Sequence, residues 1–193
     1  MKDKIVRIIT VTPIVTMVFL IELWFLKKEI YPSITYLLLA MFFLSIMTLI
    51  AYPLQKILPG WKDKGRDGQR TFALYLGMSG YLIGFIVNLV IPSTEGLDVL
   101  YGQYILSCII LFIFNKVFKV KASGHIGGLT CILVLLLYYG LYISAVIVTI
   151  LIIPVIISSI RMKRHTPKEM ASGALSAVLS MVVVLLIMHY TGR

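Results

Sequence analysis

Long apolar runs alternate with short polar segments along almost the whole chain. The apolar runs cover about residues 8–26, 33–54, 71–91, 97–118, 125–160 and 170–190. Most of them hold about 20 residues, the length that an α-helix needs to cross the hydrocarbon core of a bilayer. The run at 125–160 is too long for one crossing, and Gly140 interrupts an aromatic cluster at 138–142, where we expect the chain to reverse. The pattern predicts an all-α, polytopic membrane helix bundle of six to seven transmembrane helices.

Composition points to the same class of protein. The chain has 193 residues, of which 60% are hydrophobic and 13% are charged, and its mean hydropathy is +0.99. About a quarter of the residues in a soluble domain are charged, so the apolar excess is expected to face lipid. We predict one integral membrane domain over 1–193. The basic start followed by the run at 8–26 could be a signal peptide, but no Ala-x-Ala-like site follows, which favours an uncleaved first span.

The charge of the chain lies between the apolar runs. The net charge is +10, and 15 of the 18 lysines and arginines fall in segments 1–7, 55–70, 116–124 and 161–169. With seven spans these four segments share the side of the membrane that holds the N-terminus. The positive-inside rule then predicts a cytoplasmic N-terminus. The expected location is the cell (plasma) membrane. Cations in these places favour membrane topology and an anionic lipid head group over a nucleic acid as partner.

An even number of spans separates the three internal basic segments, so their side chains can converge on one side of the membrane. This set comprises Lys64, Arg66, Arg70, Lys121, Ser123, Gly124, His125, Arg161, Arg164 and His165. Arginine and lysine bind phosphate oxygens. Ser123 and Gly124 come directly before a helix start at His125, where backbone N–H groups point at an anion. The sequence therefore predicts a phosphate site.

Two histidines in such a site could also react. One neutral imidazole can attack phosphorus, and a second, protonated imidazole can donate a proton to the leaving group. Thr166 and Pro167 predict a helix start, which places Glu169 one turn after His165, where its carboxylate could orient the ring. The histidines and carboxylates do not have metal-ligand spacing, so this scheme needs no metal and no cofactor.

These residues resemble the type 2 phosphatidic acid phosphatase (PAP2) family of membrane lipid phosphatases. The family's second motif, Pro-Ser-Gly-His, is similar to Ala122-Ser123-Gly124-His125, and the His-x3-Asp of its third motif is similar to His165 and Glu169. The resemblance covers about residues 64–173 and suggests a short, divergent bacterial branch. It implies that His165 is the nucleophile, through a phosphohistidine, that His125 is the acid, that Glu169 orients His165, and that Ser123, Gly124 and the cations hold phosphate.

The first motif of the family, Lys-x6-Arg-Pro, is matched less closely. Five residues separate Lys64 from Arg70, and Thr71 stands where the motif has proline. Ser159 stands where the third motif has arginine, with Arg161 and Arg164 nearby. The leading hypothesis is hydrolysis of a phosphate monoester or pyrophosphate on an isoprenoid or diacylglycerol lipid. The alternatives are an anionic-lipid or anion binding and transport protein without hydrolysis, a phosphotransferase that uses a lipid acceptor, and a structural scaffold.

Overall fold

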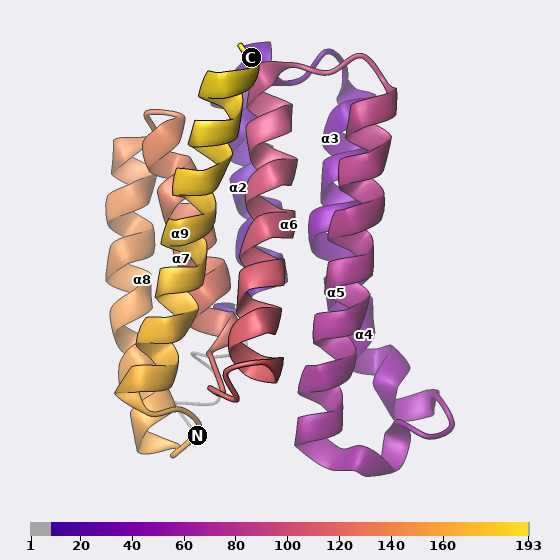
Figure 1. Cartoon of the computed structure of the whole chain (residues 1–193), viewed down its shortest axis with the longest axis vertical. Helices are drawn as coiled ribbons and strands as arrows, with labels where there is room; N and C mark the ends of the chain where they lie inside the picture. Colours follow the sequence, from indigo (N-terminus) through magenta and orange to yellow (C-terminus); the bar gives the residue numbers. More distant parts are fainter. Residues whose placement is uncertain (1–8, 193) are drawn as a thin grey trace.

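The computed structural model describes residues 9–192, apart from the side chain of Arg66. Within this range every regular element is a helix (Figure 1). The helices are α2 (Thr12–Leu26), η1 (Lys28–Ile30), α3 (Ile34–Ala40), η2 (Met41–Ile46), α4 (Met47–Ile57), η3 (Lys62–Lys64), α5 (Gly65–Val90), α6 (Glu95–Lys116), α7 (Gly124–Tyr138), α8 (Tyr142–Arg161) and α9 (Pro167–Thr191). α3, the π-helical turn η2 and α4 follow one another without a break, so they form one long helix.

Five of these helices are long and apolar enough to cross a membrane. They are Ile34–Ile57, Asp67–Val90, Glu95–Lys116, Tyr142–Arg161 and Pro167–Thr191. α2 and α7 are apolar but shorter, with 15 residues each, and a helix of that length spans only about 22 Å. Large apolar side chains are exposed along most of the long helices, for example Ile143 and Val90. The all-helical fold with these apolar helices indicates a membrane protein.

The helix bounds differ from the predicted runs at three places. Pro53, near the end of the run at 33–54, favours a helix end there, but the second helix continues through Pro53 to Ile57, so this expectation is wrong. In a membrane bundle, neighbouring groups can satisfy the backbone groups that a proline leaves unpaired. α5 begins at Gly65, so Arg70 belongs to its first turns. α2 begins at Thr12, with Pro13 in its first turn. The expected reversal is confirmed, with α7 ending at Tyr138 and α8 starting at Tyr142.

Connections between helices alternate between two ends of the bundle (Figure 1). The segments after α4, after α6 and after α8 all lie at one end, the lower end in Figure 1, which we call the site end. The segments after α2, after α5 and after α7 lie at the opposite end. The polar segments that were expected to share one side therefore lie at the same end of the bundle.

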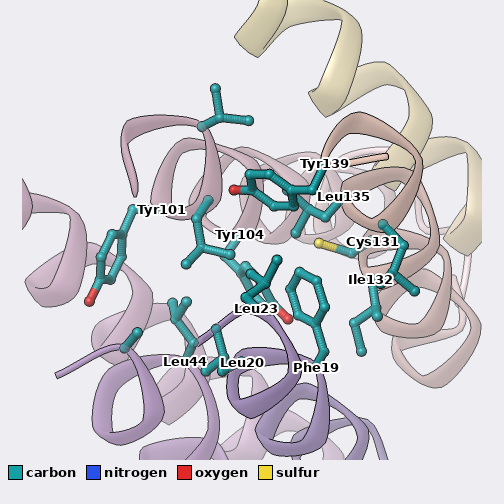
Figure 2. Packing of buried hydrophobic residues seen from close by; sticks show 14 of the residues in the cluster. Phe19, Leu20, Leu23, Leu44, Tyr101, Tyr104, Cys131, Ile132, Leu135 and Tyr139 are labelled. Carbon is teal, nitrogen blue, oxygen red and sulfur yellow. The ribbon is translucent and has the colours of Figure 1, made fainter. Parts of the chain in front are cut away.

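The buried core joins α2, α6, α7 and α9. Figure 2 shows Phe19 and Leu23 of α2 among residues such as Tyr104, Ile132 and Leu135. All five are almost fully buried. α7 and α9 make the most extensive helix–helix contact, followed by α6 and α9. α9 is therefore held on two sides, and it carries Glu169 in its first turn.

Candidate functional site

One cavity collects residues from α2, α4, α5, α6, α7 and the segment before α9. Its volume is about 360 Å³. Both His125 and His165 line it, together with Arg70 and Lys116. Along α5 its lining runs from Asp67 to Tyr81, which is about 20 Å of helix. The two histidines thus share one cavity that extends from the site end toward the middle of the bundle.

His165 and Glu169 form a close pair at the start of α9. Nδ1 of His165 lies 3.0 Å from Oε2 of Glu169, and the His165 side chain is only 4% exposed. The same oxygen accepts a hydrogen bond from the backbone N–H of Thr166 at 3.0 Å, and the Thr166 hydroxyl oxygen accepts from the N–H of Glu169. This is a capping box, as the Thr-Pro start indicated. Because a carboxylate accepts hydrogen bonds, Nδ1 carries the ring proton of neutral His165 and its lone pair lies on Nε2.

Two backbone contacts hold the start of α7 against α9. The N–H of Ser123 donates to the carbonyl oxygen of Glu169 at 2.9 Å. A side chain at Gly173 would overlap the backbone of Ser123, and a Cβ at Gly127 would lie 2.9 Å from the carbonyl oxygen of Gly173. Glycines at these positions let the two helices approach closely. The segments that carry the two histidines are therefore joined through backbone atoms.

His125, the second residue of α7, faces the start of the chain. Its Nε2 lies 2.7 Å from the carbonyl oxygen of Thr10 and 3.3 Å from the Thr10 hydroxyl. The backbone oxygen of His125 accepts a longer hydrogen bond, at 3.4 Å, from the hydroxyl of Thr12. A residue larger than glycine at position 128 would overlap Thr12. The segment before α2 is thus packed directly against the ring and the helix that carries it.

The predicted phosphate ligands are distributed unevenly. Gly124 and Arg70 line the cavity. Ser123 is fully buried, and its hydroxyl oxygen accepts from the N–H of Ile126 as the N-cap of α7. Lys121 lies at the same end and forms an ion pair with Asp67 at 3.6 Å. The site therefore receives fewer of the expected ligands than the sequence pattern placed there.

Three other predicted cations lie outside the cavity lining that the described residues make: Lys64, Arg161 and Arg164. Lys64 is exposed, with its Nζ 4.3 Å from the centre of the Trp61 ring. Arg161 is exposed at the last turn of α8, and Arg164 is half-buried in the connection to α9. Arg66 lies in the first turn of α5, and its side chain is outside the described part of the chain.

Several cavity residues were not singled out as ligands. Lys116 and Asn115 come from the last turn of α6. Because Lys116 lies in a basic segment after an apolar run, its position favours a role in membrane topology. Asp67 pairs with Arg70 at 3.9 Å as well as with Lys121. The inner part of the cavity meets the rings of Tyr81 and Tyr104, whose centres are 5.3 Å apart. The sequence signal for Asn115 and Lys116 was their position as polar residues near the end of an apolar run.

Residues 9–192 contain no group of three or more His, Cys, Asp or Glu side chains placed to hold a metal ion. Comparison with known proteins adds no relative. A scan against protein-family models finds no match to this chain, and searches of curated proteins and of solved structures find none either. Function must therefore be argued from the site.

Proposed function

We propose that this protein is a membrane-embedded lipid phosphatase of the PAP2 type. It would hydrolyse a phosphate monoester or a pyrophosphate on an isoprenoid or diacylglycerol lipid. The observation that carries the proposal is that His165 and His125 line one cavity with Arg70 and Lys116. Glu169 contacts Nδ1 of His165 at 3.0 Å. A nucleophile oriented by a carboxylate, a second titratable ring and two cations are the parts that metal-independent phosphoryl transfer requires.

In the first step Nε2 of neutral His165 attacks phosphorus. A P–N bond forms as the P–O bond to the lipid breaks, and the leaving oxygen takes a proton from the His125 imidazolium. The Glu169 carboxylate accepts a hydrogen bond from Nδ1–H and stabilises the positive ring of the phosphohistidine, as the aspartate does in a hydrolase triad. Arg70 and Lys116 stabilise the phosphoryl oxygens.

In the second step water attacks the phosphohistidine. Neutral His125 takes a proton from this water, a P–O bond forms, and the electron pair of the P–N bond returns to Nε2 of His165. Both histidines are then in their starting states, and the products are the lipid alcohol, or lipid monophosphate from a pyrophosphate, and inorganic phosphate. His125 therefore serves first as acid and then as base.

The proposal includes seven spans, with α2 and α7 crossing as shortened helices. The catalytic core would cover about 64–173. Fifteen cations would lie on the side of the site and three on the other, which places the N-terminus and the site on the cytoplasmic face of the cell membrane. This orientation is tested with single cysteines introduced at Lys62 and at Glu95. A membrane-impermeant maleimide, added to intact cells, reports which of them is accessible from outside. Labelling at Lys62 rather than Glu95 would reverse it.

The enzymatic proposal is tested by phosphate release from purified protein in detergent, over a panel of isoprenoid and diacylglycerol phosphates and pyrophosphates. We expect at least one of them to be hydrolysed. With a ³²P-labelled substrate, we also expect label to appear on the protein as acid-labile phosphohistidine. Saturable binding of a lipid phosphate without phosphate release would instead support the binding or transport function. Transfer of label to a lipid alcohol but not to water would support a phosphotransferase.

A further inference from the structure

The carbonyl oxygen of Thr10 is turned away from the helix that follows it. In a helix that continued upstream, this oxygen would accept from the N–H of Ile14. Here the N–H of Ile14 donates to Val11 at 2.9 Å. Pro13, in the first turn, has no N–H to offer to Ile9. Pro13 thus suits the first turn of α2, and the Thr10 carbonyl oxygen has a partner on another helix.

That partner is the His125 ring. A carbonyl oxygen can only accept, so the 2.7 Å contact requires a proton on Nε2 of His125. The contact joins residues 115 positions apart in the chain, and Thr10 is itself only 5% exposed. A hydrogen bond to a carbonyl is stronger when the donor ring is charged. The contact thus fixes the orientation of the ring.

The segment that carries this carbonyl is anchored on its other side. The hydroxyl of Ser45, fully buried in η2, donates to the carbonyl oxygen of Pro13 at 2.6 Å. Val11, Thr12 and Pro13 line the cavity beside His125. The start of α2 is therefore held between η2 and α7, and it forms one wall of the candidate site.

We infer that the Thr10 carbonyl is a positioning group for His125, so that the segment before α2 completes the acid half of the site. This inference rests on the proposed function, in which His125 protonates the leaving group. Glu169 orients His165 from α9, and Thr10 orients His125 from the segment before α2. If Thr10 orients the acid, its loss should slow only those reactions in which the leaving group must be protonated.

The test weakens this one acceptor in the full-length protein. Incorporating the α-hydroxy analogue of valine at residue 11 converts the Thr10–Val11 amide into an ester, whose carbonyl is a poorer acceptor. The same change at Val18, which is exposed on α2, is the matched control, since it alters a helical peptide bond away from His125. Phosphate release is measured with an alkyl lipid phosphate, which has a poor leaving group, and with para-nitrophenyl phosphate, which has a good one.

We expect the ester at residue 11 to lower kcat for the alkyl phosphate about tenfold, while kcat for para-nitrophenyl phosphate falls less than about twofold. The ester at residue 18 should change the two substrates equally. An equal loss on both substrates for the residue 11 ester, or no loss on either, would overturn the inference, because either result shows that the contact does not serve proton donation.

A second measurement does not depend on activity. The protein is labelled with ¹⁵N-histidine, and the NMR signals of the His125 ring are identified by their absence in His125→Asn. We expect the Nε2 signal to be that of a protonated nitrogen. It should shift when residue 11 carries the ester and stay unchanged when residue 18 does. A bare Nε2 in the unaltered protein would refute the hydrogen bond itself. Lack of phosphate release by the unaltered protein would end the proposed function, and with it the role of Thr10 in catalysis, even where this spectrum supports the contact.

Discussion

The two ends of the bundle use their polar groups in opposite ways. At the opposite end, polar side chains close the connections: the Thr94 hydroxyl donates to the Ile30 carbonyl, and Tyr139 donates to the Gly96 carbonyl. Burial raises the pKa of Tyr139 well above its ordinary value, so its hydroxyl stays a donor. Asp98 accepts from Asn88 and Ser93. These groups stabilise turns, and Thr94, Gly96 and Tyr139 also line a second, more open pocket at this end.

At the site end, polar groups lie around a more enclosed cavity of about 360 Å³. Its lining includes one histidine from α7, one from the segment before α9 and two cations, and a carboxylate on α9 contacts the second histidine. A network that satisfies itself supports the fold, whereas one arranged around a cavity supports binding or chemistry. The five predictions below test this contrast and run from the largest expected effect on phosphate release to the smallest.

Replacement of His165 by alanine should abolish phosphate release, by about 10³-fold or more, because it removes the nucleophile. Because the ring is only 4% exposed and contacts Glu169, the thermal unfolding midpoint in detergent should fall as well, and activity is therefore compared per folded molecule. His189→Ala is the matched control: His189 lies in the last turn of α9, at the opposite end, and makes an edge-to-face contact with Tyr190. Full activity in His165→Ala, or loss in His189→Ala, would contradict the assignment of the two ends.

Changes at Glu169 separate its two roles. Alanine removes the carboxylate half of the capping box and the orientation of His165, and should lower kcat about 100-fold. Glutamine can place its one carbonyl oxygen where Oε2 accepts from His165 and Thr166. It should keep the cap, lose only the negative charge, and lower kcat about tenfold. The measurement is kcat for the best lipid phosphate, and equal losses in the two variants would show that charge is the whole contribution.

Gly173→Ala should destabilise the protein by about 1–3 kcal/mol and lower activity, because a Cβ there overlaps the Ser123 backbone and must push α9 from α7. Gly102→Ala in α6 is the control, since its Cβ would lie 3.4 Å from Val184, an ordinary contact. That variant should be neutral or slightly more stable. Thermal unfolding in detergent and specific activity measure both. A neutral Gly173→Ala would mean that the two helices are not held this closely.

Arg70→Gln should raise KM about tenfold for a lipid phosphate, through loss of a charge-assisted contact at the cavity. Lys64→Gln should leave KM within about twofold, because Lys64 lies over Trp61 and outside the cavity lining. Steady-state kinetics in detergent compares the two. The reverse pattern would restore Lys64 as the ligand that the sequence motif suggested.

Asp98→Ala should leave specific activity unchanged while lowering stability by about 1–3 kcal/mol. It removes the acceptor of hydrogen bonds from Asn88 Nδ2, at 2.7 Å, and from Ser93 Oγ, at 2.6 Å, and Asn88 is 2% exposed. Thermal unfolding and phosphate release are measured on the same preparation. A loss of activity per folded molecule would show that the opposite end also takes part in function.

Much of this architecture could be predicted from the sequence, because a membrane helix can be recognised from a local run of apolar residues. The apolar runs located the helices, the reversal at 138–142 was placed correctly, and Thr166-Pro167 marked the start of α9. The spacing of His165 and Glu169 predicted their contact, although His165 lies just before α9 and meets Glu169 at the helix cap rather than on a shared helix face. Pro53 misled because a neighbouring helix can compensate for a lost hydrogen bond inside a bundle.

Contacts between helices could not be predicted in the same way. Which cations reach the cavity depends on how each helix is rotated, so Arg70 and Lys116 line it while Lys64 and Arg161 do not. The contact of Thr10 with His125 spans 115 positions and uses a backbone carbonyl that no sequence motif records. Local composition thus determined where the helices lie and which residues share an end, whereas packing alone decided which of those residues meet, because rotation and close approach depend on side chains far apart in the chain.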